Sequence, residues 1–567
     1  MNIFIKDFAH LVEEDDYTLA VQEALMECRK HSQITLVFEK KTYHFRKKYA
    51  FQKEYFMSNN DYSLKSIIFP LIGFKGLTID GGGADFIMHG EILPFVIDHS
   101  ENVTVKNFSI DYPRPFFSQA KIIASENGHT DLEFDTKAFP CRVENDGIVF
   151  YSEEPDYMSK APTFRVLAAE FDVQTGGPSA FISPYIARFS KEHTPSFLDS
   201  FTKYCRVEQL SENIIRLNGI DGHTVGNYWA TTHANRDNPG ILINFSKDTM
   251  LEKINLYHTA AMGVIGQVSE NIILNQVNTI VREGSNRYIS VSADSTHFVN
   301  CSGQVNLFDC TFTNMLDDAG NFHGTYTTIN KILNKNTLLV EFRHHQQKGV
   351  MLYQKGDTIH LIENSTLASF AELTVKEASW LSGDFIRIET EEALPAETKL
   401  GNAVENYSRM PSVHIKGCVS GHNRPRGFLI TTNKKVVIEE CTFYNMMCGL
   451  HFTGDANDWF ESGPVRDVTV RNNNFKNSSY TGGAAIAIDP AVKVKENNYY
   501  HSGITIENNT FEMHEKRFLS MHNSKNVIFR NNKYICNPSM PAHQQIRQDG
   551  ISVSDCKDCI IEEPVEN

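Results

Sequence analysis

Short runs of alternating apolar and polar residues recur along most of the chain, each followed by a polar pair and an aromatic residue. The clearest copies begin at Val103, Val436, Val468, Ile504 and Val527, and less regular ones at Leu77, Leu251, Ile272, Val305 and Val413. Two pairs of neighbouring copies, at 413 and 436 and at 504 and 527, are 23 residues apart, and the spacing is 32 and 36 residues where a loop lengthens. A repeat of ~20–25 residues without long helices is typical of a β-solenoid, in which each coil buries its apolar face against the next. We therefore predict an all-β fold, a right-handed parallel β-helix.

Two columns of side chains should run through the C-terminal coils if these copies stack. The aromatic positions are expected to form one internal stack of Phe443, Phe475, Phe511 and Tyr534. Two residues before each of them, a ladder at a turn is expected from Cys441, Asn473, Asn509 and Asn532. We interpret these asparagines as structural residues.

Residues 16–30 carry apolar side chains at positions 21, 24, 25 and 28, which is helical spacing. A strand is predicted directly afterwards, at residues 34–38. An amphipathic helix at this place would cover the open end of the solenoid core, which otherwise exposes unpaired backbone groups. We therefore expect an N-terminal capping helix.

Two stretches interrupt the repeat, residues 112–240 and 326–408, and both carry irregular β patterns. Solenoids accept insertions in the loops between coils, so both stretches are predicted to be small inserted β modules. The chain is accordingly divided into five parts: the cap and first coils (1–111), a β-rich module (112–240), coils with candidate catalytic acids (241–325), a barrel-like module (326–408) and the C-terminal coils (409–567).

Charge narrows the classes of partner. The 567 residues include 54 Lys and Arg against 69 Asp and Glu, a net charge of −15. A net negative surface repels phosphate groups, so we expect neither nucleic acid nor a membrane surface as a partner. The sequence also lacks a run of ~18 apolar residues, which excludes a transmembrane helix.

The N-terminal residues and the cysteines indicate in which cellular compartment the protein is expected. The chain opens without a basic segment followed by an apolar core, so we expect no signal peptide. The 11 cysteines lack the paired spacing of a metal site, and four of them lie in strand-like segments as small apolar residues: Cys301, Cys310, Cys418 and Cys441. Reduced thiols suit a cytoplasmic protein, whereas a trimmed leader would indicate a secreted or periplasmic one.

The densest group of candidate catalytic residues is a set of three carboxylates between the two interruptions. Asp294 precedes Asp317 by 23 residues, one repeat length, so we expect these two residues one coil apart on the same side of the solenoid. Adjacent carboxylates on a plain strand would point to opposite faces, so Asp317 and Asp318 are expected at a strand–turn junction that faces a cleft. A solvated acidic turn and a bound cation are the alternatives.

Neighbouring carboxylates repel each other, so at least one of the three should have a raised pKa and stay protonated near neutral pH. A protonated carboxyl can act as a general acid while an ionised partner activates water. Inverting glycosidases separate these two carboxyls by ~6.5–9.5 Å and retaining ones by ~5–5.5 Å. Stacking at ~4.8 Å with a diagonal offset is compatible with both, so the spacing leaves the stereochemistry open.

An arginine is predicted beside one of these carboxylates. Cys310 and Cys418 align as neighbouring copies, and Asp318 and Arg426 each lie eight residues further on. Arg426, with Arg424 close by, would keep the carboxylate ionised or bind a substrate hydroxyl. A surface ion pair is the alternative interpretation.

Aromatic and imidazole side chains complete the candidate site. Trp459 lies in the Gly- and Asp-rich loop of residues 454–463, where its ring suits stacking on a sugar face or packing beneath the loop. His297 and His323 are candidates to orient a carboxylate, although isolated histidines are more often structural.

Several of these segments resemble one known family in sequence order over most of the chain. The matching segments are FSIDYPRP (108–115), ADSTHF (293–298), DDA (317–319), NFHGTY (321–326), RPRG (424–427) and GDANDWFESG (454–463). They resemble glycoside hydrolase family 110, the α-1,3-galactosidases.

The resemblance implies a β-helix with inserted β modules and an exo-acting, inverting enzyme that removes terminal α-1,3-linked galactose without a metal or other cofactor. The essential aspartates of the family fall on Asp294, Asp317 and Asp318. The partner is then a galactose-terminated oligosaccharide or glycan. The residues expected to bind it are His297, His323, Arg424, Arg426, Asp455, Trp459 and Glu461.

Other functions on the same predicted fold remain open. A pectin-type hydrolase also uses a trio of aspartates on neighbouring coils, and Arg424 and Arg426 would suit its anionic sugars. A polysaccharide lyase is less favoured because it needs Ca²⁺ and a basic catalyst. A non-catalytic carbohydrate-binding solenoid is the third alternative. A homo-oligomer, a dimer or a trimer, is also expected if an inserted module reaches a neighbouring subunit.

Overall fold

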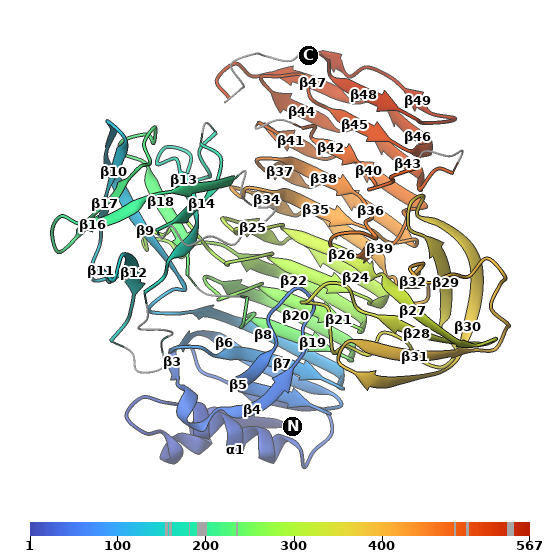
Figure 1. Ribbon diagram of the computed structural model, residues 1–567. Helices are drawn as coiled ribbons and strands as arrows, with labels where there is room; N and C mark the ends of the chain where they lie inside the picture. The colour runs from blue at the N-terminus through green and yellow to red at the C-terminus, as the bar shows by residue number, and fades with distance from the viewer. Residues whose placement is uncertain are drawn as a thin grey trace.

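Parallel strands of successive coils pair along two long sheets, one of 21 strands and one of 13. This computed structural model describes residues 1–566 apart from 154–156, 158–161, 181, 190–200, 234–235, 481–482, 495–497 and 541–548. The coils form a column that runs from the N-terminal helix to the C-terminus, with one module on each side (Figure 1). The predicted parallel β-helix is confirmed.

The C-terminal coils stack in the predicted register. Val413, Val436, Val468, Ile504 and Val527 each stand opposite the next residue in this series. They lie on the strands β33 (Ser412–Lys416), β36 (Lys435–Glu439), β40 (Asp467–Arg471), β43 (His501–Glu507) and β46 (Ser524–Arg530). All five side chains are buried, so the apolar positions of the repeat are the inward-facing ones.

Both predicted columns are present. The rings of Phe443, Phe475 and Phe511 stack at 5.0 Å between successive centroids, whereas Tyr534, one coil further on, packs against Phe518. In the ladder, the side-chain oxygen of each asparagine accepts the backbone N–H of the residue one coil before it, at 2.9–3.0 Å. The ladder thus satisfies buried backbone donors at a turn, which is the structural role expected of these asparagines.

One copy of the repeat was predicted in the wrong register. β20 (Lys247–Leu256) pairs with β8 (Glu101–Asp111) and β22 (Glu270–Thr279), and Thr249 stands opposite both Val103 and Ile272. This copy therefore begins at Thr249, two residues before Leu251. Thr249 is buried, and its β-branched side chain takes the inward position that an aliphatic residue takes in the neighbouring coils.

The N-terminal end of the core is covered by α1 (Thr18–Cys28), which is followed by β2 (Ile34–Val37). The predicted apolar face of this helix, Val21, Ala24, Leu25 and Cys28, is buried in the same core cluster as the β-helix interior. This confirms the capping helix. None of the described helices could cross a membrane, since α1, with 11 residues, is the longest of them.

Two β modules leave the column between coils. The first lies between β8 and β19 (Ile241–Asn244) and contains an eight-stranded sheet with its own core of buried residues. Its strands are β9 (Phe117–Glu126), β10 (His129–Phe134), β13 (Arg165–Phe171), β14 (Tyr185–Arg188), β15 (Thr202–Tyr204), β16 (Arg206–Gln209), β17 (Ile214–Asn218) and β18 (Tyr228–Thr232), beside a hairpin of β11 (Cys141–Glu144) and β12 (Gly147–Phe150).

The second module follows β26 (Gly320–Thr325) and is a closed six-stranded barrel. Its strands are β27 (Thr327–Asn334), β28 (Thr337–Glu341), β29 (Thr358–Glu363), β30 (Ala368–Ser382), β31 (Phe385–Thr390) and β32 (Ala403–Asn406). The two modules flank the coils that carry the candidate catalytic acids (Figure 1). Loops from both therefore reach the same part of the column.

Candidate active site

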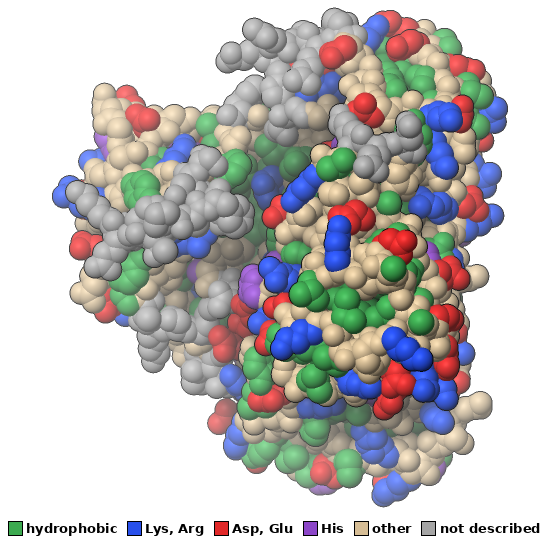
Figure 2. All heavy atoms as spheres, turned by 45° about the vertical axis from the view of Figure 1, so that its right-hand side comes forward, with side chains coloured by type: hydrophobic (Ala, Val, Ile, Leu, Met, Phe, Trp, Pro, Cys, Tyr) green, Lys and Arg blue, Asp and Glu red, His purple; other side chains and the backbone are tan. Residues whose placement is uncertain are grey.

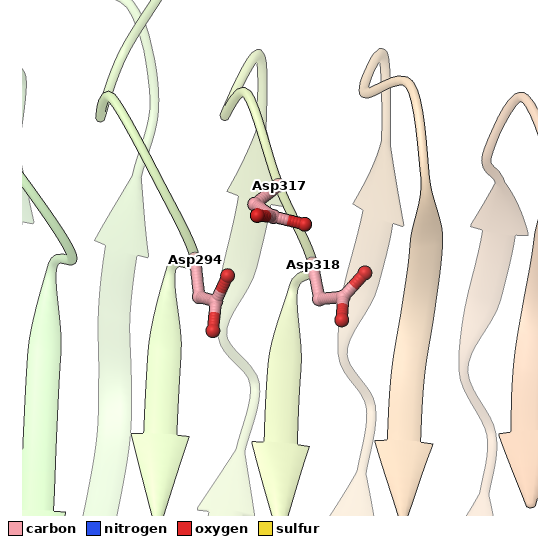
Figure 3. A group of neighbouring side chains, drawn as sticks. All are labelled: Asp294, Asp317 and Asp318. Carbon is pink, nitrogen blue, oxygen red and sulfur yellow. The ribbon is translucent and has the colours of Figure 1, made fainter. Parts of the chain in front are cut away.

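Asp294, Asp317 and Asp318 converge on one side of the β-helix (Figure 3). Asp294 precedes β23 (Thr296–Val299), and the other two lie in the turn before β26. One carboxylate oxygen from each residue lies within 4.8 Å of one from each of the others. The carboxylates therefore meet at a strand–turn junction, where backbone geometry lets adjacent side chains share a face.

The register between these coils differs from the predicted one by one residue. Thr296 stands opposite Gly320, so Asp294 aligns with Asp318 and not with Asp317. The Ser295 N–H accordingly donates to the Asp318 carbonyl at 2.8 Å. Turn lengths differ from coil to coil, so a repeat length counted in the sequence does not set the register to a single residue.

Each of the two adjacent aspartates has its own arginine. Arg426 Nε and Nη2 donate to the two oxygens of Asp318 at 2.8 and 2.9 Å, which confirms the pair predicted from the cysteine alignment. Arg236 Nη2 donates to Asp317 Oδ2 at 2.5 Å. Arg236 lies at the end of the first module, between β18 and β19, and no motif in the sequence singles it out.

The surroundings separate the pKa values of the carboxyls. Burial, together with the charge of Asp317, raises the pKa of Asp294 to about 8. Burial also acts to raise the pKa of Asp317, but Arg236, Arg426 and Arg424 outweigh it and hold that pKa below its usual range. The site therefore contains a carboxyl that favours its proton beside one that is ionised.

Asp318 is held by geometry as a carboxylate. Burial and the charges of Asp317 and Asp294 raise its pKa to about 8, as for Asp294. However, both of its oxygens already accept hydrogen bonds from the Arg426 side chain, and Oδ1 also accepts the Arg426 backbone N–H at 3.2 Å. Guanidinium groups thus balance Asp317 and Asp318, so this arrangement does not need a cation to neutralise them.

The two candidate histidines lie behind the carboxylates and are fully buried. His297 Nδ1 is 2.8 Å from Asp294 Oδ2, and His297 Nε2 is 3.0 Å from His323 Nε2. Neither residue lines the cavity described next. His297 contacts Asp294, and His323 contacts His297, so both histidines fit the predicted role of orienting a carboxylate better than that of binding a sugar.

A cavity of about 320 Å³ opens above the three aspartates. Its lining includes Arg426 and four residues of the 454–463 loop, Asp455, Asp458, Trp459 and Glu461. The Asp455 carboxylate accepts the backbone N–H groups of residues 457, 458 and 459 at 2.8–2.9 Å, so it shapes the loop. Glu461 Oε1 accepts a hydrogen bond from Asn321 Nδ2 at 3.2 Å.

Trp459 lines this cavity and contacts the barrel module. Its side chain is 47% exposed, and its other contacts come from the loop after β28 of the barrel. The His344 ring lies 4.9 Å from the Trp459 ring, and Gln347 Nε2 donates to the Trp459 carbonyl at 2.7 Å. The second module thus positions an aromatic side chain at the edge of the site.

A second cavity of about 860 Å³ lies between the first module and the β-helix. It shares part of its lining, Arg236, Asp317, Arg426 and Trp459, with the smaller cavity, and Arg424 lines only this outer one. Figure 2 shows the recess between the lobe of the first module and the column of coils. A small inner cavity with the carboxylates at its floor therefore opens into a wider outer one.

Family models match two parts of the chain. Residues 337–404 match the GLAA-B beta-barrel domain II, and residues 426–565 match the right handed beta helix region. The second match agrees with the predicted handedness. Among solved structures, a family 28 exopolygalacturonase of Yersinia enterocolitica is 10% identical to this chain. Its superposition has a TM-score of 0.40 and covers 99% of this chain and 78% of that chain.

Curated relatives align over almost the whole chain. An alpha-1,3-galactosidase A of Shewanella woodyi is 32% identical, and the alignment covers 93% of this chain and 84% of the relative. An alpha-1,3-galactosidase B of Bacteroides thetaiotaomicron is 31% identical over 95% of this chain and 87% of the relative. The chain belongs to the α-1,3-galactosidase family, glycoside hydrolase family 110.

Proposed function

We propose that this protein is an exo-acting glycoside hydrolase that releases terminal α-1,3-linked galactose from oligosaccharides or glycans. The observation that carries the proposal is the trio Asp294, Asp317 and Asp318 at the floor of a small cavity, with an arginine paired to each of the last two. The substrate class comes from the named relatives, and the chemistry comes from these residues.

Hydrolysis of a glycosidic bond needs a proton donor for the leaving oxygen and a base for the attacking water. Asp294, whose pKa burial and Asp317 raise to about 8, is the proposed acid. Asp317 is the proposed base because its pKa is lowered and its side chain, 21% exposed, is the one of the three that solvent reaches most easily. Asp318 stays bound to Arg426.

We propose inversion at the anomeric carbon, as the family resemblance implies. The carboxylate oxygens that lie within 4.8 Å of one another are nearer to the ~5–5.5 Å of retaining enzymes than to the ~6.5–9.5 Å of inverting ones, so the spacing does not support the proposal and the charge state has to carry it. The charge state supports attack by water: Asp317 and Asp318 each share their charge with a guanidinium, which makes them weak nucleophiles, and Asp294 favours its protonated form.

The two joined cavities support exo action on a glycan chain. A terminal galactose would occupy the inner cavity of about 320 Å³, and the rest of the glycan would extend into the outer one of about 860 Å³. Trp459 lines both, so its ring is placed to stack on the apolar face of a sugar.

A screen of terminal α-1,3-, α-1,4- and α-1,6-galactosides, with galacturonan beside them, tests the proposal. We expect turnover of the α-1,3-galactoside, and losses of ~10²–10⁴ in rate for the Asp294→Asn and Asp317→Asn variants. Turnover of galacturonan alone would favour a pectin-type hydrolase, and binding without release of sugar would favour a carbohydrate-binding solenoid. Wild-type rates in both variants would overturn the assignment of the site.

Two further measurements test the mechanism independently of the substrate specificity. NMR of the first product formed should show β-galactose, and an α-anomer would exclude inversion. An aryl galactoside with a good leaving group does not need the acid, so Asp294→Asn should keep more of its activity on that substrate than Asp317→Asn does. The reverse order would exchange the two roles.

A further inference from the structure

A buried turn from the N-terminal coils reaches the inner cavity. It joins β4 (Phe51–Tyr55) to β5 (Ser63–Ile72), two strands that pair as an antiparallel hairpin. Residues 57–60 of this turn are buried, and Asn59, which is 3% exposed, lines the inner cavity. We propose that Asn59 binds the substrate in this cavity and that Asp61 is a positioning residue, which holds the turn against both inserted modules.

Asn59 brings a hydrogen-bond donor to the cavity. Its backbone lies in the left-handed region, with a φ of 57°, and asparagine adopts this region more readily than most residues with a side chain. Its Oδ1 accepts a hydrogen bond from Ser58 Oγ at 3.4 Å, but no residue in the described part of the chain accepts one from its Nδ2. This amide can therefore donate to a sugar hydroxyl when a substrate occupies the inner cavity.

Asp61 links the turn to both modules. Its backbone N–H donates to the Arg236 carbonyl at 2.9 Å, at the end of the first module, and its Oδ1 accepts from Gln346 Nε2 of the barrel at 2.8 Å. A second bond joins the turn to the barrel, since the Asn59 N–H donates to the Gln346 carbonyl at 2.9 Å. The turn is thus held between the segment that carries Arg236 and the barrel loop that supports Trp459.

A buried lysine strengthens the contact with the first module. Lys65 is 1% exposed, and its Nζ donates to the Asp237 carbonyl and, at 3.3 Å, to the Asp61 carbonyl. A buried ammonium group needs such acceptors because it has lost its hydration. Asp237 directly follows Arg236, so one lysine ties this segment to the turn. The turn therefore helps to position Arg236 and Trp459, which line both cavities, although it belongs to neither module.

The role of Asn59 rests on the proposed function and is tested by substrate kinetics. Asn59→Gly removes the amide but suits the left-handed backbone, so its unfolding midpoint should stay near that of the wild type. We expect KM for an α-1,3-galactoside to rise about three- to tenfold, with a smaller change in kcat. Asn127→Gly, at another left-handed asparagine that lines neither cavity, is the matched control and should leave KM unchanged.

A second variant separates the chemistry of the amide from its volume. Asn59→Asp keeps the size of the side chain but replaces the donor with an acceptor, so KM should rise at least as much as in Asn59→Gly. A wild type that releases no galactose would contradict the proposed function. An active wild type whose KM is shared by both variants would overturn the role of Asn59.

The positioning role of Asp61 is tested by rescue and by coupling. Asp61→Ala removes the acceptor of Gln346 Nε2, so KM should rise about threefold or more, whereas Asp61→Asn keeps an acceptor oxygen and should restore most of the wild-type KM. Gln346→Ala breaks the same side-chain bond, so the double variant with Asp61→Ala should raise KM no further than either single variant does. Additive effects would overturn the coupling.

Hydrogen exchange tests the same contact without substrate. Amide exchange in the barrel loop, residues 343–349, should be faster in Asp61→Ala than in the wild type and in Asp61→Asn. Equal exchange in all three proteins would overturn the positioning role of Asp61. This measurement holds whether or not the protein cleaves a galactoside, so it fails separately from the proposed function.

Discussion

Arg426 holds Asp318 with two parallel hydrogen bonds, Nε to Oδ1 at 2.8 Å and Nη2 to Oδ2 at 2.9 Å. The residues are 108 positions apart in the sequence but lie on neighbouring coils, because the barrel module occupies the sequence between them. A carboxylate held at both oxygens by charge-assisted hydrogen bonds cannot rotate freely, and both of its oxygens act as acceptors. Arg426 therefore fixes the orientation of the Asp318 carboxylate within the trio and balances its charge.

Replacing Arg426 should damage both catalysis and stability. In Arg426→Ala the buried Asp318 carboxylate loses its partner, and such a loss typically costs ~3–5 kcal/mol in the free energy of unfolding. We expect kcat/KM to fall by about 10²-fold or more. Arg426→Lys keeps the charge but not the two parallel hydrogen bonds. Its kcat/KM and its free energy of unfolding should therefore lie between those of Arg426→Ala and the wild type. Equal kcat/KM for Arg426→Ala and the wild type would contradict this prediction.

The Arg236–Asp317 pair predicts a shift of the acidic limb in the pH profile. Arg236 helps to hold the pKa of Asp317 below its usual range, so Arg236→Gln should raise that pKa. A base must be ionised, and activity is therefore lost as the pH falls through its pKa. The acidic limb of kcat/KM should move to higher pH by about one unit or more in Arg236→Gln, and less in Arg236→Lys. An acidic limb that stays in place would show that Asp317 is not the base.

Trp459 is expected to contribute to binding more than to the chemical step. Trp459→Ala removes a half-exposed ring at the junction of both cavities, so we expect KM for an α-1,3-galactoside to rise about tenfold while kcat changes less. Trp380→Ala is a matched control, since Trp380 is 37% exposed on the barrel and lines neither of these cavities. Similar KM values for the two variants would exclude sugar stacking on Trp459.

The asparagine ladder predicts a stability effect away from the site. Asn509 is fully buried, and its side chain accepts from the Asn473 backbone N–H and donates to the Val470 carbonyl, both at 3.0 Å. Asn509→Ala leaves both groups without a partner and should cost about 2 kcal/mol or more in the free energy of unfolding. Guanidinium denaturation measures this cost, with the half-buried Thr505→Ala as control. Equal midpoints for the two variants would contradict a structural role of the ladder.

Much of the column could be predicted from the chain alone, because a parallel β-helix repeats a local pattern. The apolar positions of each coil face the same interior, so Val436, Val468 and Ile504 align in space as they align in the pattern. For the same reason, the alignment of Cys310 with Cys418 correctly predicted that Asp318 contacts Arg426. The predicted register was wrong at Thr249, where a polar residue type occupies a buried position that is apolar in the neighbouring coils.

The tertiary structure decided the features that depend on contacts between unlike segments. Arg236 reaches Asp317 from the end of the first module, and the turn lengths of single coils place Asp294 opposite Asp318. His297 and His323 come into contact, Nε2 to Nε2 at 3.0 Å, only because their coils stack. Periodic burial thus determined the coils and most of their register, whereas unrepeated loops, whose positions no period encodes, determined the charge state of the site.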